Sequence, residues 1–309
     1  MKALFARLPN TVDARIRAFA IATLVAQIAI VGTGGAVRLT GSGLGCPTWP
    51  RCTADSFVTT PEMGVHGIIE FGNRLLTFVL IAIAIVMFVL VLRIRRERRD
   101  LFVLALLIGL GIPAQGVIGG ISVLTNLDPY VVGLHFVVSV VLVVLSTMLV
   151  YRVYAGSRGA RSAVPRWYSR LAHATSVLVG ITIIIGILTT GSGPHAGDSG
   201  AARNGLDSVL LQHLHSWPAY ATFAATVLLL LGALRLSQLR LVRFTAILLA
   251  IEVVQIAVGL AQARMGLPGI LVGIHMVLAT CLAASMTAVV LSLREPATSR
   301  VEKLDSVED

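Results

Sequence analysis

Eight long apolar stretches constrain this chain more than any other feature. They lie at residues 18–39, 64–92, 101–120, 131–151, 171–190, 208–234, 244–263 and 269–293. Each is close to the length of about 20 residues that a helix needs to cross about 30 Å of hydrocarbon. With 56% hydrophobic and only 13% charged residues, the 309-residue chain has too little polar surface for a water-soluble fold. The sequence therefore predicts an all-α membrane protein with eight transmembrane helices.

The positive charges indicate how the helices are oriented. If both termini are cytoplasmic, 20 of the 25 Lys and Arg residues fall on the inner side of the membrane. This is the positive-inside signature, so the net charge of +10 reflects orientation and attraction to the lipid bilayer rather than nucleic-acid binding. We expect a multi-pass protein of the cell (plasma) membrane with both termini cytoplasmic. The five arginines on the outer side are Arg38, Arg51, Arg74, Arg203 and Arg264.

The two halves of the chain resemble each other. At an offset of 140, Gln115, Gly119 and His135 match Gln255, Gly259 and His275. The tetrapeptide Thr-Gly-Ser-Gly occurs at 40–43 and again at 190–193, an offset of 150. Such self-similarity predicts two repeated four-helix bundles derived from one unit.

The repeat and the charge pattern together suggest a domain organisation. A cytoplasmic N-terminal segment is expected at 1–17 and a cytoplasmic tail at 294–309. The first four-helix half is expected at 18–151 and the second at 171–293. A basic cytoplasmic linker, 152–170, connects them.

Histidines near the outer ends of the even-numbered spans are candidate ligands. Histidine is rare inside hydrocarbon, so an intramembrane histidine indicates function. His135 and His275 lie near the outer ends of spans four and eight, and His213 and His215 near the outer start of span six. One imidazole from each of two helices is an economical way to hold a heme iron, whereas zinc usually takes more ligands. His213 and His215 point about 200° apart on a helix, so only one can face a heme.

Span two carries a polar stripe. His66, Glu70 and Asn73 are spaced i, i+4 and i+7, so their side chains project from one helix face. The span follows the first outer loop, which contains Cys46 and Cys52. On the oxidising side of the membrane, these cysteines are expected to form a disulfide or to act as a redox pair.

Three motifs resemble those of the heme A synthase family. They are the run Gly34–Cys52, the run Ile69–Arg74 and the run Thr190–Asp198. The resemblance covers the whole chain. It implies oxidation of the C8 methyl group of heme O to a formyl group, which makes heme A for terminal oxidases, with heme b as a bound cofactor. It also implies three partners: a heme O synthase, the cytochrome oxidase assembly machinery and an unidentified electron acceptor.

One position departs from the pattern of that family. Span two commonly reads Glu-x-x-His-Arg, and here Asn73 stands at the histidine position between Glu70 and Arg74. Asparagine is a poor ligand for iron. Either His66 substitutes for it from the same helix face, or His135 alone holds a five-coordinate substrate heme beside an open position.

Comparison of the halves assigns roles. At the offset of 140, Asn73 corresponds to His213 and Glu70 to an apolar residue, so the second half keeps a histidine and loses the carboxylate. We therefore expect the chemistry in the first half, with Glu70 as the catalytic group that accepts a proton or stabilises a cationic carbon. Heme b is expected in the second half, between His275 and one other histidine. The repeat favours His213, and resemblance to the sixth span of the family favours His215.

The remaining polar residues leave alternatives open. Arg38, Arg203 and Arg264 are expected to contact either heme propionates or lipid headgroups. Glu252 in span seven has no assigned role. A diheme b-type protein that only transfers electrons would share the histidines but would need neither Glu70 nor the cysteines. A transporter built from parallel repeats would also account for eight spans.

Overall fold

The computed structural model describes residues 8–296 of the chain. Within this range it contains eight long helices: α2 (Ala14–Leu39), α3 (Gly64–Val91), α4 (Arg99–Leu124), α5 (Pro129–Ala155), α6 (Arg166–Ser192), α7 (Ser208–Arg235), α8 (Leu239–Arg264) and α9 (Gly269–Ser292). Each is long and apolar enough to cross a membrane, which confirms the predicted spans. Several helices begin before the apolar stretch, because polar residues at a helix end are compatible with the headgroup region. Residues 1–7 and 297–309, from the expected terminal segments, lie outside the described residues.

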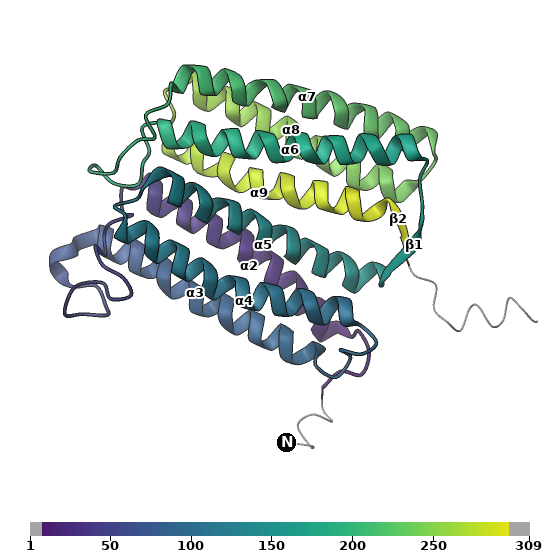
Figure 1. Ribbon diagram of the computed structural model, residues 1–309, viewed down its shortest axis with the longest axis horizontal. Coiled ribbons are helices and arrows are strands. Elements are labelled where there is room, and N and C mark those ends of the chain that lie inside the picture. The colour runs from purple at the N-terminus through teal and green to yellow at the C-terminus, as the bar shows by residue number, and fades with distance from the viewer. Residues whose placement is uncertain (1–7, 297–309) are drawn as a thin grey trace, which may run out of the picture.

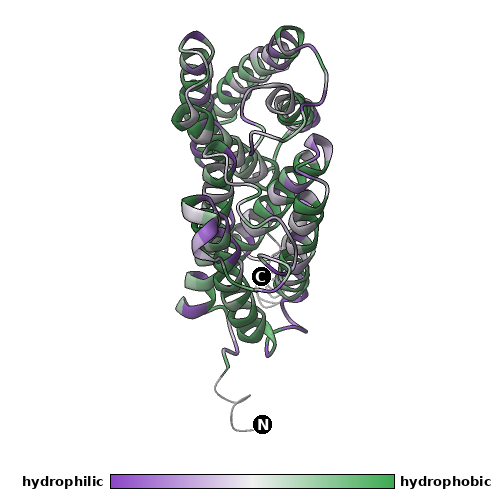
Figure 2. Ribbon diagram, turned by 90° about the vertical axis from the view of Figure 1, so that its left-hand side faces the viewer, coloured by the Kyte–Doolittle hydropathy of each residue, from purple (hydrophilic) through white to green (hydrophobic). Residues whose placement is uncertain are grey.

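The helices pack in two groups along the chain. Figure 1 shows α2, α3, α4 and α5 on one side of the molecule and α6, α7, α8 and α9 on the other. Each group has its own buried apolar cluster, the first around Leu101 and Leu149 and the second around Leu229 and Leu248. The groups meet mainly where α9 packs against α2 and α5. Apolar side chains cover most of the outer helix surface, as suits hydrocarbon surroundings (Figure 2).

Aspartates start three of the helices. Asp13, Asp128 and Asp207 are the N-cap residues of α2, α5 and α7, and each side chain accepts hydrogen bonds from backbone N–H groups of the first helical turn. The first N–H groups of a helix have no partner within the helix, so this capping stabilises the helix start.

A small sheet joins the connection between α5 and α6 to the segment after α9. Strand β1 (Arg158–Ser162) pairs antiparallel with β2 (Arg294–Pro296). The connection between α5 and α6 is therefore shorter than the expected linker 152–170, because both helices extend into it. Sequence patterns do not predict these strands, since they are short and lack alternation of apolar and polar residues.

The loop between α2 and α3 is closed by a disulfide and folds over the end of the first helix group. Cys46 and Cys52 are bonded and fully buried, which confirms the disulfide alternative. A short 3-10 helix, η1 (Pro61–Met63), ends the loop before α3. The ring of Trp49 lies so close to Gly120 of α4 that a Cβ atom there would overlap it. Glycine at this position therefore allows the loop to approach the helix.

Arg38 connects the two helix groups at the end of the molecule that carries the disulfide loop. It lies in the last turn of α2, and its Nε donates a hydrogen bond to the carbonyl of His195 at 2.7 Å. Its Nη2 donates to the carbonyl of Thr190 at 3.2 Å. Beside it, the backbone N–H of Gly43 donates to the carbonyl of Gly197 at 2.8 Å. The loop after α2 and the loop after α6 are thus held against each other.

Replacement of Arg38 should weaken this connection. Arg38→Met removes two charge-assisted hydrogen bonds between the helix groups, so we expect the free energy of unfolding to fall by about 2–3 kcal/mol. Thermal unfolding in detergent, followed by circular dichroism, measures the change. The control is Arg203→Met, because Arg203 donates only to nearby carbonyls of its own loop. Equal melting temperatures for the two variants would contradict the role of Arg38.

Candidate functional site

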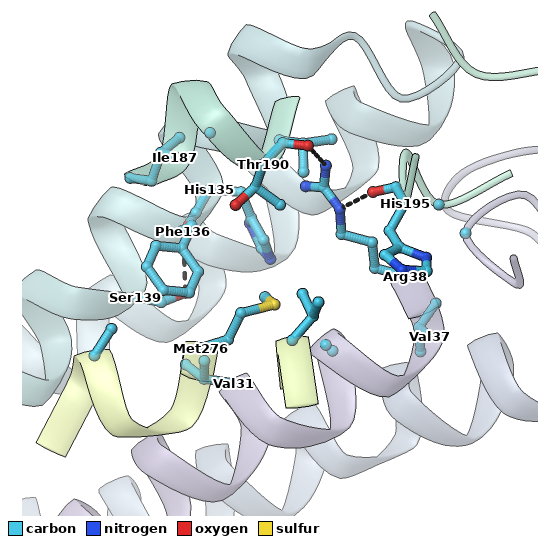
Figure 3. Close-up of a pocket in the computed structure, with 18 of the residues that line it drawn as sticks. Val31, Val37, Arg38, His135, Phe136, Ser139, Ile187, Thr190, His195 and Met276 are labelled. Atoms are coloured by element: carbon cyan, nitrogen blue, oxygen red, sulfur yellow. Dashed lines mark hydrogen bonds between the residues drawn. The ribbon is translucent and has the colours of Figure 1, made fainter. Parts of the chain in front are cut away.

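A cavity of about 1140 Å³ lies within the helices. All eight long helices contribute to its lining, together with the loops after α2 and α6. Pockets for one small molecule usually have volumes of about 300–1,000 Å³, so this cavity has room for more than one ligand. Figure 3 shows part of it, with His135, Arg38 and Met276 around the same space.

The residues that line the cavity repeat between the two helix groups. On α4 and α8, and on α5 and α9, lining positions match at the offset of 140. On α3 and α7 the offset is 142. The matched pairs of lining residues are Glu70 and Gln212, Asn73 and His215, Arg74 and Ser216, Thr77 and Ala219, Phe78 and Tyr220, and Leu80 and Thr222. On α2 and α6 it is 152. This register corrects the sequence alignment of Asn73 with His213, since Asn73 corresponds to His215.

Four side chains at matching places each face a glycine on a neighbouring helix. The pairs are Asn73 with Gly34, His135 with Gly119, His215 with Gly186, and His275 with Gly259. A Cβ atom on Gly119 or on Gly259 would lie 3.2 Å from Cε1 of the facing histidine, and one on Gly186 only 2.8 Å. A larger residue at these glycines would therefore displace the imidazole. Three of the four places hold a histidine, and the fourth holds an asparagine.

His215 and His275 face each other across the second helix group. Their ring centroids lie 6.2 Å apart. An imidazole nitrogen binds a metal at about 2 Å, so two axial imidazoles on one iron have ring centres about 6 Å apart. His215 Nδ1 lies 3.0 Å from the carbonyl of Thr182, a bond that leaves Nε2 free for a ligand. His213 is exposed and is not among the lining residues, so the structure pairs His275 with His215.

The matched glutamines hold the helices that carry His135 and His275. Nε2 of Gln115 donates to the carbonyl of His135 at 3.0 Å, and Nε2 of Gln255 donates to that of His275 at 3.1 Å. In both histidines Nδ1 is buried and has no hydrogen-bond partner among the described residues. Buried polar atoms without partners are uncommon, so each ring has capacity to bind something the cavity contains.

A heme suits these residues better than a lone metal ion does. Across residues 8–296, no group of three or more His, Cys, Asp or Glu residues could hold a metal ion. Zinc sites generally require that many protein ligands. A heme supplies four iron ligands itself and leaves only the axial positions to the protein, which fits two facing imidazoles.

Glu70 connects α3 to the disulfide loop. Its side chain is 5% exposed and lines the cavity. One carboxylate oxygen forms an ion pair with Arg74, and the other accepts a hydrogen bond from the backbone N–H of Cys46. Arg74 also donates to the carbonyls of Cys46 and Thr48, both at 3.1 Å. Both oxygens of Glu70 are therefore engaged, and the carboxylate is fixed in position.

Several predicted site residues lie elsewhere. His66 Nδ1 is 2.9 Å from the hydroxyl of Ser42, and His66 does not line the cavity. Arg203 and Arg264 do not line it either, whereas Arg38 and Arg74 do. His66 is therefore not brought to the part of the cavity that Asn73 and His135 line.

Sequence reasoning missed a polar wall in the second helix group. Glu252 of α8 is 4% exposed, lines the cavity and accepts a hydrogen bond from Thr226 at 2.8 Å. Its other carboxylate oxygen has no partner within the described part of the chain. The matching positions in the first group are aliphatic: Thr222, Thr226 and Glu252 stand where the first group has Leu80, Ala84 and Ile112. The match of Glu252 with Ile112 follows the offset of 140 already seen in the sequence, whereas the matches of Thr222 and Thr226 need the offset of 142.

Comparison with known proteins gives the family. The family described as Cytochrome oxidase assembly protein matches residues 17–287. A protein named Heme A synthase from Bacillus pumilus (strain SAFR-032) is 30% identical over 149 residues, 47% of this chain and 46% of that protein. Another protein with this name, from Lysinibacillus sphaericus (strain C3-41), is 33% identical over 141 residues, 44% of this chain and 45% of its own length. The aligned region thus spans about half the length of these relatives. Because the family match extends over most of this chain, the chain belongs to the cytochrome oxidase assembly protein family.

Proposed function

We propose that this multi-pass membrane protein is a heme A synthase, which oxidises the C8 methyl group of heme O to a formyl group. One observation carries the proposal: the second helix group has two facing imidazoles, whereas the first has one imidazole and Asn73 at the matching place. The names of the relatives support it. A fully ligated heme suits electron transfer, and a site with an open position suits a substrate that must react.

The same proposal includes the arrangement in the membrane. The lining register supports two repeated four-helix bundles, 18–151 and 171–293. The distribution of Lys and Arg along the sequence supports the placement of both termini on the cytoplasmic side of the plasma membrane. The site then lies toward the outer side, where the disulfide loop covers the first bundle. The expected partners are a heme O synthase that supplies the substrate, the cytochrome oxidase assembly machinery that receives the product, and an electron acceptor.

The second bundle is proposed to hold heme b between His215 and His275. A bound heme b would supply a one-electron carrier for electrons that leave the substrate. The carbonyl of Thr182 fixes the His215 ring through Nδ1, and Gln255 holds the backbone of His275. Gly186 and Gly259 leave room for the two rings. These residues orient both imidazoles.

The first bundle is proposed to bind heme O. His135 would ligate its iron, and Asn73 leaves the opposite position open. Arg38 and Arg74 line the outer part of the cavity and are suited to charged propionate groups. Trp49, carried by the disulfide loop, closes the space above Gly120. Together these groups position the substrate and exclude water from it.

Glu70 is proposed as the catalytic carboxylate. Conversion of a methyl to a formyl group adds an oxygen atom, which water can supply, and passes electrons to the electron acceptor while protons leave. A carboxylate beside the carbon can accept one of these protons or stabilise positive charge there. The bonds from Arg74 and Cys46 hold it in one orientation in the cavity wall. These same bonds also favour an alternative in which Glu70 has a structural role only. If Glu70 only anchors the loop, the protein is a diheme b-type electron-transfer protein.

Heme extraction and mass analysis separate these functions. After co-expression with a heme O synthase, a heme A synthase should yield heme A or a hydroxylated intermediate. A protein that contains only heme b, whatever the supply of heme O, would be an electron-transfer protein.

The two neighbouring histidines of α7 should behave differently when replaced. We expect His215→Ala to abolish the low-spin heme b spectrum, because the iron loses one axial ligand. His213→Ala should leave it unchanged, since His213 does not line the cavity. Absorption and electron paramagnetic resonance spectra of the purified proteins measure the difference. The opposite result would remove the assignment of His215.

Glu70→Gln tests the catalytic role. Glutamine keeps the shape but can neither accept a proton nor carry charge, so heme A formation should fall by about 10²–10⁴-fold while hemes remain bound. Extraction and chromatography beside the unmodified protein measure the product. Thiol labelling without reductant checks that the Cys46–Cys52 loop is intact. Normal product from an intact protein would leave Glu70 with a structural role only.

Asn73→His tests the open position. The new imidazole would occupy the place that matches His215, so it should face His135 and convert the first-bundle heme to low spin. Spectra of protein loaded with heme O measure the spin state. A high-spin heme in this variant would show that position 73 does not face the iron.

A further inference from the structure

Some residues of the first bundle line the cavity and lie on the outer surface at the same time. On α3, Leu75 is 47% exposed and Phe78 is 67% exposed. In the outer loop, Phe57 is 63% and Val58 is 55% exposed. Pro113 of α4 is also exposed. A side chain that lines the cavity and is also exposed marks a place where the cavity opens to the surroundings of the protein. We call the opening between these five residues the α3–α4 slit.

The slit lies at the depth of the hydrocarbon. Phe78 is 14 residues from the outer end of α3 at Gly64, which corresponds to about 21 Å along the helix. Pro113 is 11 residues from the outer end of α4 at Leu124, or about 16 Å. Both distances reach well into a hydrocarbon layer of about 30 Å. The slit therefore opens to lipid and not to water, and it extends upward to Phe57 and Val58 in the loop.

The slit is apolar, and the corresponding positions in the second bundle are less so. All five of its residues are apolar. In the second bundle the position of Phe78 holds Tyr220, which adds a hydroxyl group. The positions of Leu75 and Pro113 hold Trp217 and Val253, and neither of these lines the cavity. In the second bundle Gln212, Tyr220 and Leu260 both line the cavity and are exposed, so the opening there includes polar groups. The bundle with Asn73 in place of a histidine thus has the more apolar lateral opening.

We propose that the α3–α4 slit holds the isoprenoid tail of heme O and admits this substrate from the bilayer. The inference rests on the proposed function and adds a binding subsite to it. A long hydrocarbon tail is unfavourable in water, so a tailed heme resides in the membrane. An opening along α3 lets the macrocycle reach His135 while the tail remains in apolar surroundings. The tail lies between Leu75 and Phe78 on one side and Pro113 on the other.

Neighbouring residues on α3 provide matched controls. Leu76 and Val79 are also exposed, at 38% and 52%, but neither lines the cavity. A tryptophan at position 75 adds bulk inside the slit, whereas one at position 76 adds the same bulk to the lipid-facing surface. Heme b offers a matched ligand, because it has the iron macrocycle and propionates but no isoprenoid tail.

The test is a spectroscopic titration of purified protein whose second bundle already contains heme b. Heme O and heme b are added in turn, and absorption changes give the two dissociation constants. We expect the unmodified protein to prefer heme O, and Leu75→Trp to reduce this preference about tenfold by weakening heme O binding alone. Leu76→Trp should retain the preference. Should Leu75→Trp fail to fold, Phe78→Ala and Val79→Ala form a second pair with the same expected contrast.

Two results would overturn the proposal. If Leu75→Trp or Phe78→Ala weakens both hemes equally, or leaves the preference intact, the slit contains bilayer lipid and not the tail. If the control variants lose the preference as strongly, the effect comes from the surface of α3. Failure of the unmodified protein to bind either added heme is a distinct outcome, which would remove the proposed function and the slit with it.

Discussion

The site depends on glycines at positions where larger side chains would fill the space between neighbouring helices. In hydrocarbon, backbone polar groups must be bonded within helices, so a binding site has to be built from side chains between intact helices. Gly119, Gly186 and Gly259 each face an imidazole, and Gly34 faces Asn73. Small residues let helices approach closely in membranes. Here they also leave room for the imidazole rings. The cavity and the positions of the candidate ligands both depend on this room.

The proposed duplication explains why the two helix groups share this plan, and a few substitutions explain why they differ. Asn73 and His215 occupy matching places, as do Ile112 and Glu252. The first exchange leaves the first bundle with one imidazole, and the second gives the second bundle a buried carboxylate. Neither exchange requires a change in the helices themselves. The same scaffold can therefore present a fully ligated place in one bundle and an open one in the other.

Sequence reasoning reached the eight spans, the Cys46–Cys52 disulfide and the glutamine-histidine pairs, because each depends on local composition or on a repeat without insertions. It could not place His66 or decide between His213 and His215. Outer loops of different length separate the first and second helices of each bundle, and apolar residues on either side of an insertion give no sign of register. The offsets of 142 and 152 appear only when side chains are seen around one cavity. Glu252 remained unassigned although it matches Ile112 at the offset of 140, because its hydrogen bond from Thr226 of α7 is visible only in the structure.

Glu70, the proposed catalytic carboxylate, also stabilises the disulfide loop. Its ion pair with Arg74 and its bond to the N–H of Cys46 fix both oxygens at the cavity wall. Electrostatic stabilisation of a reaction works best when the charge is already oriented, since no reorganisation is then needed as the transition state forms. Arg74 also holds the loop that carries Trp49 against Gly120. The disulfide loop, the wall of the cavity and the orientation of the carboxylate therefore form one connected unit.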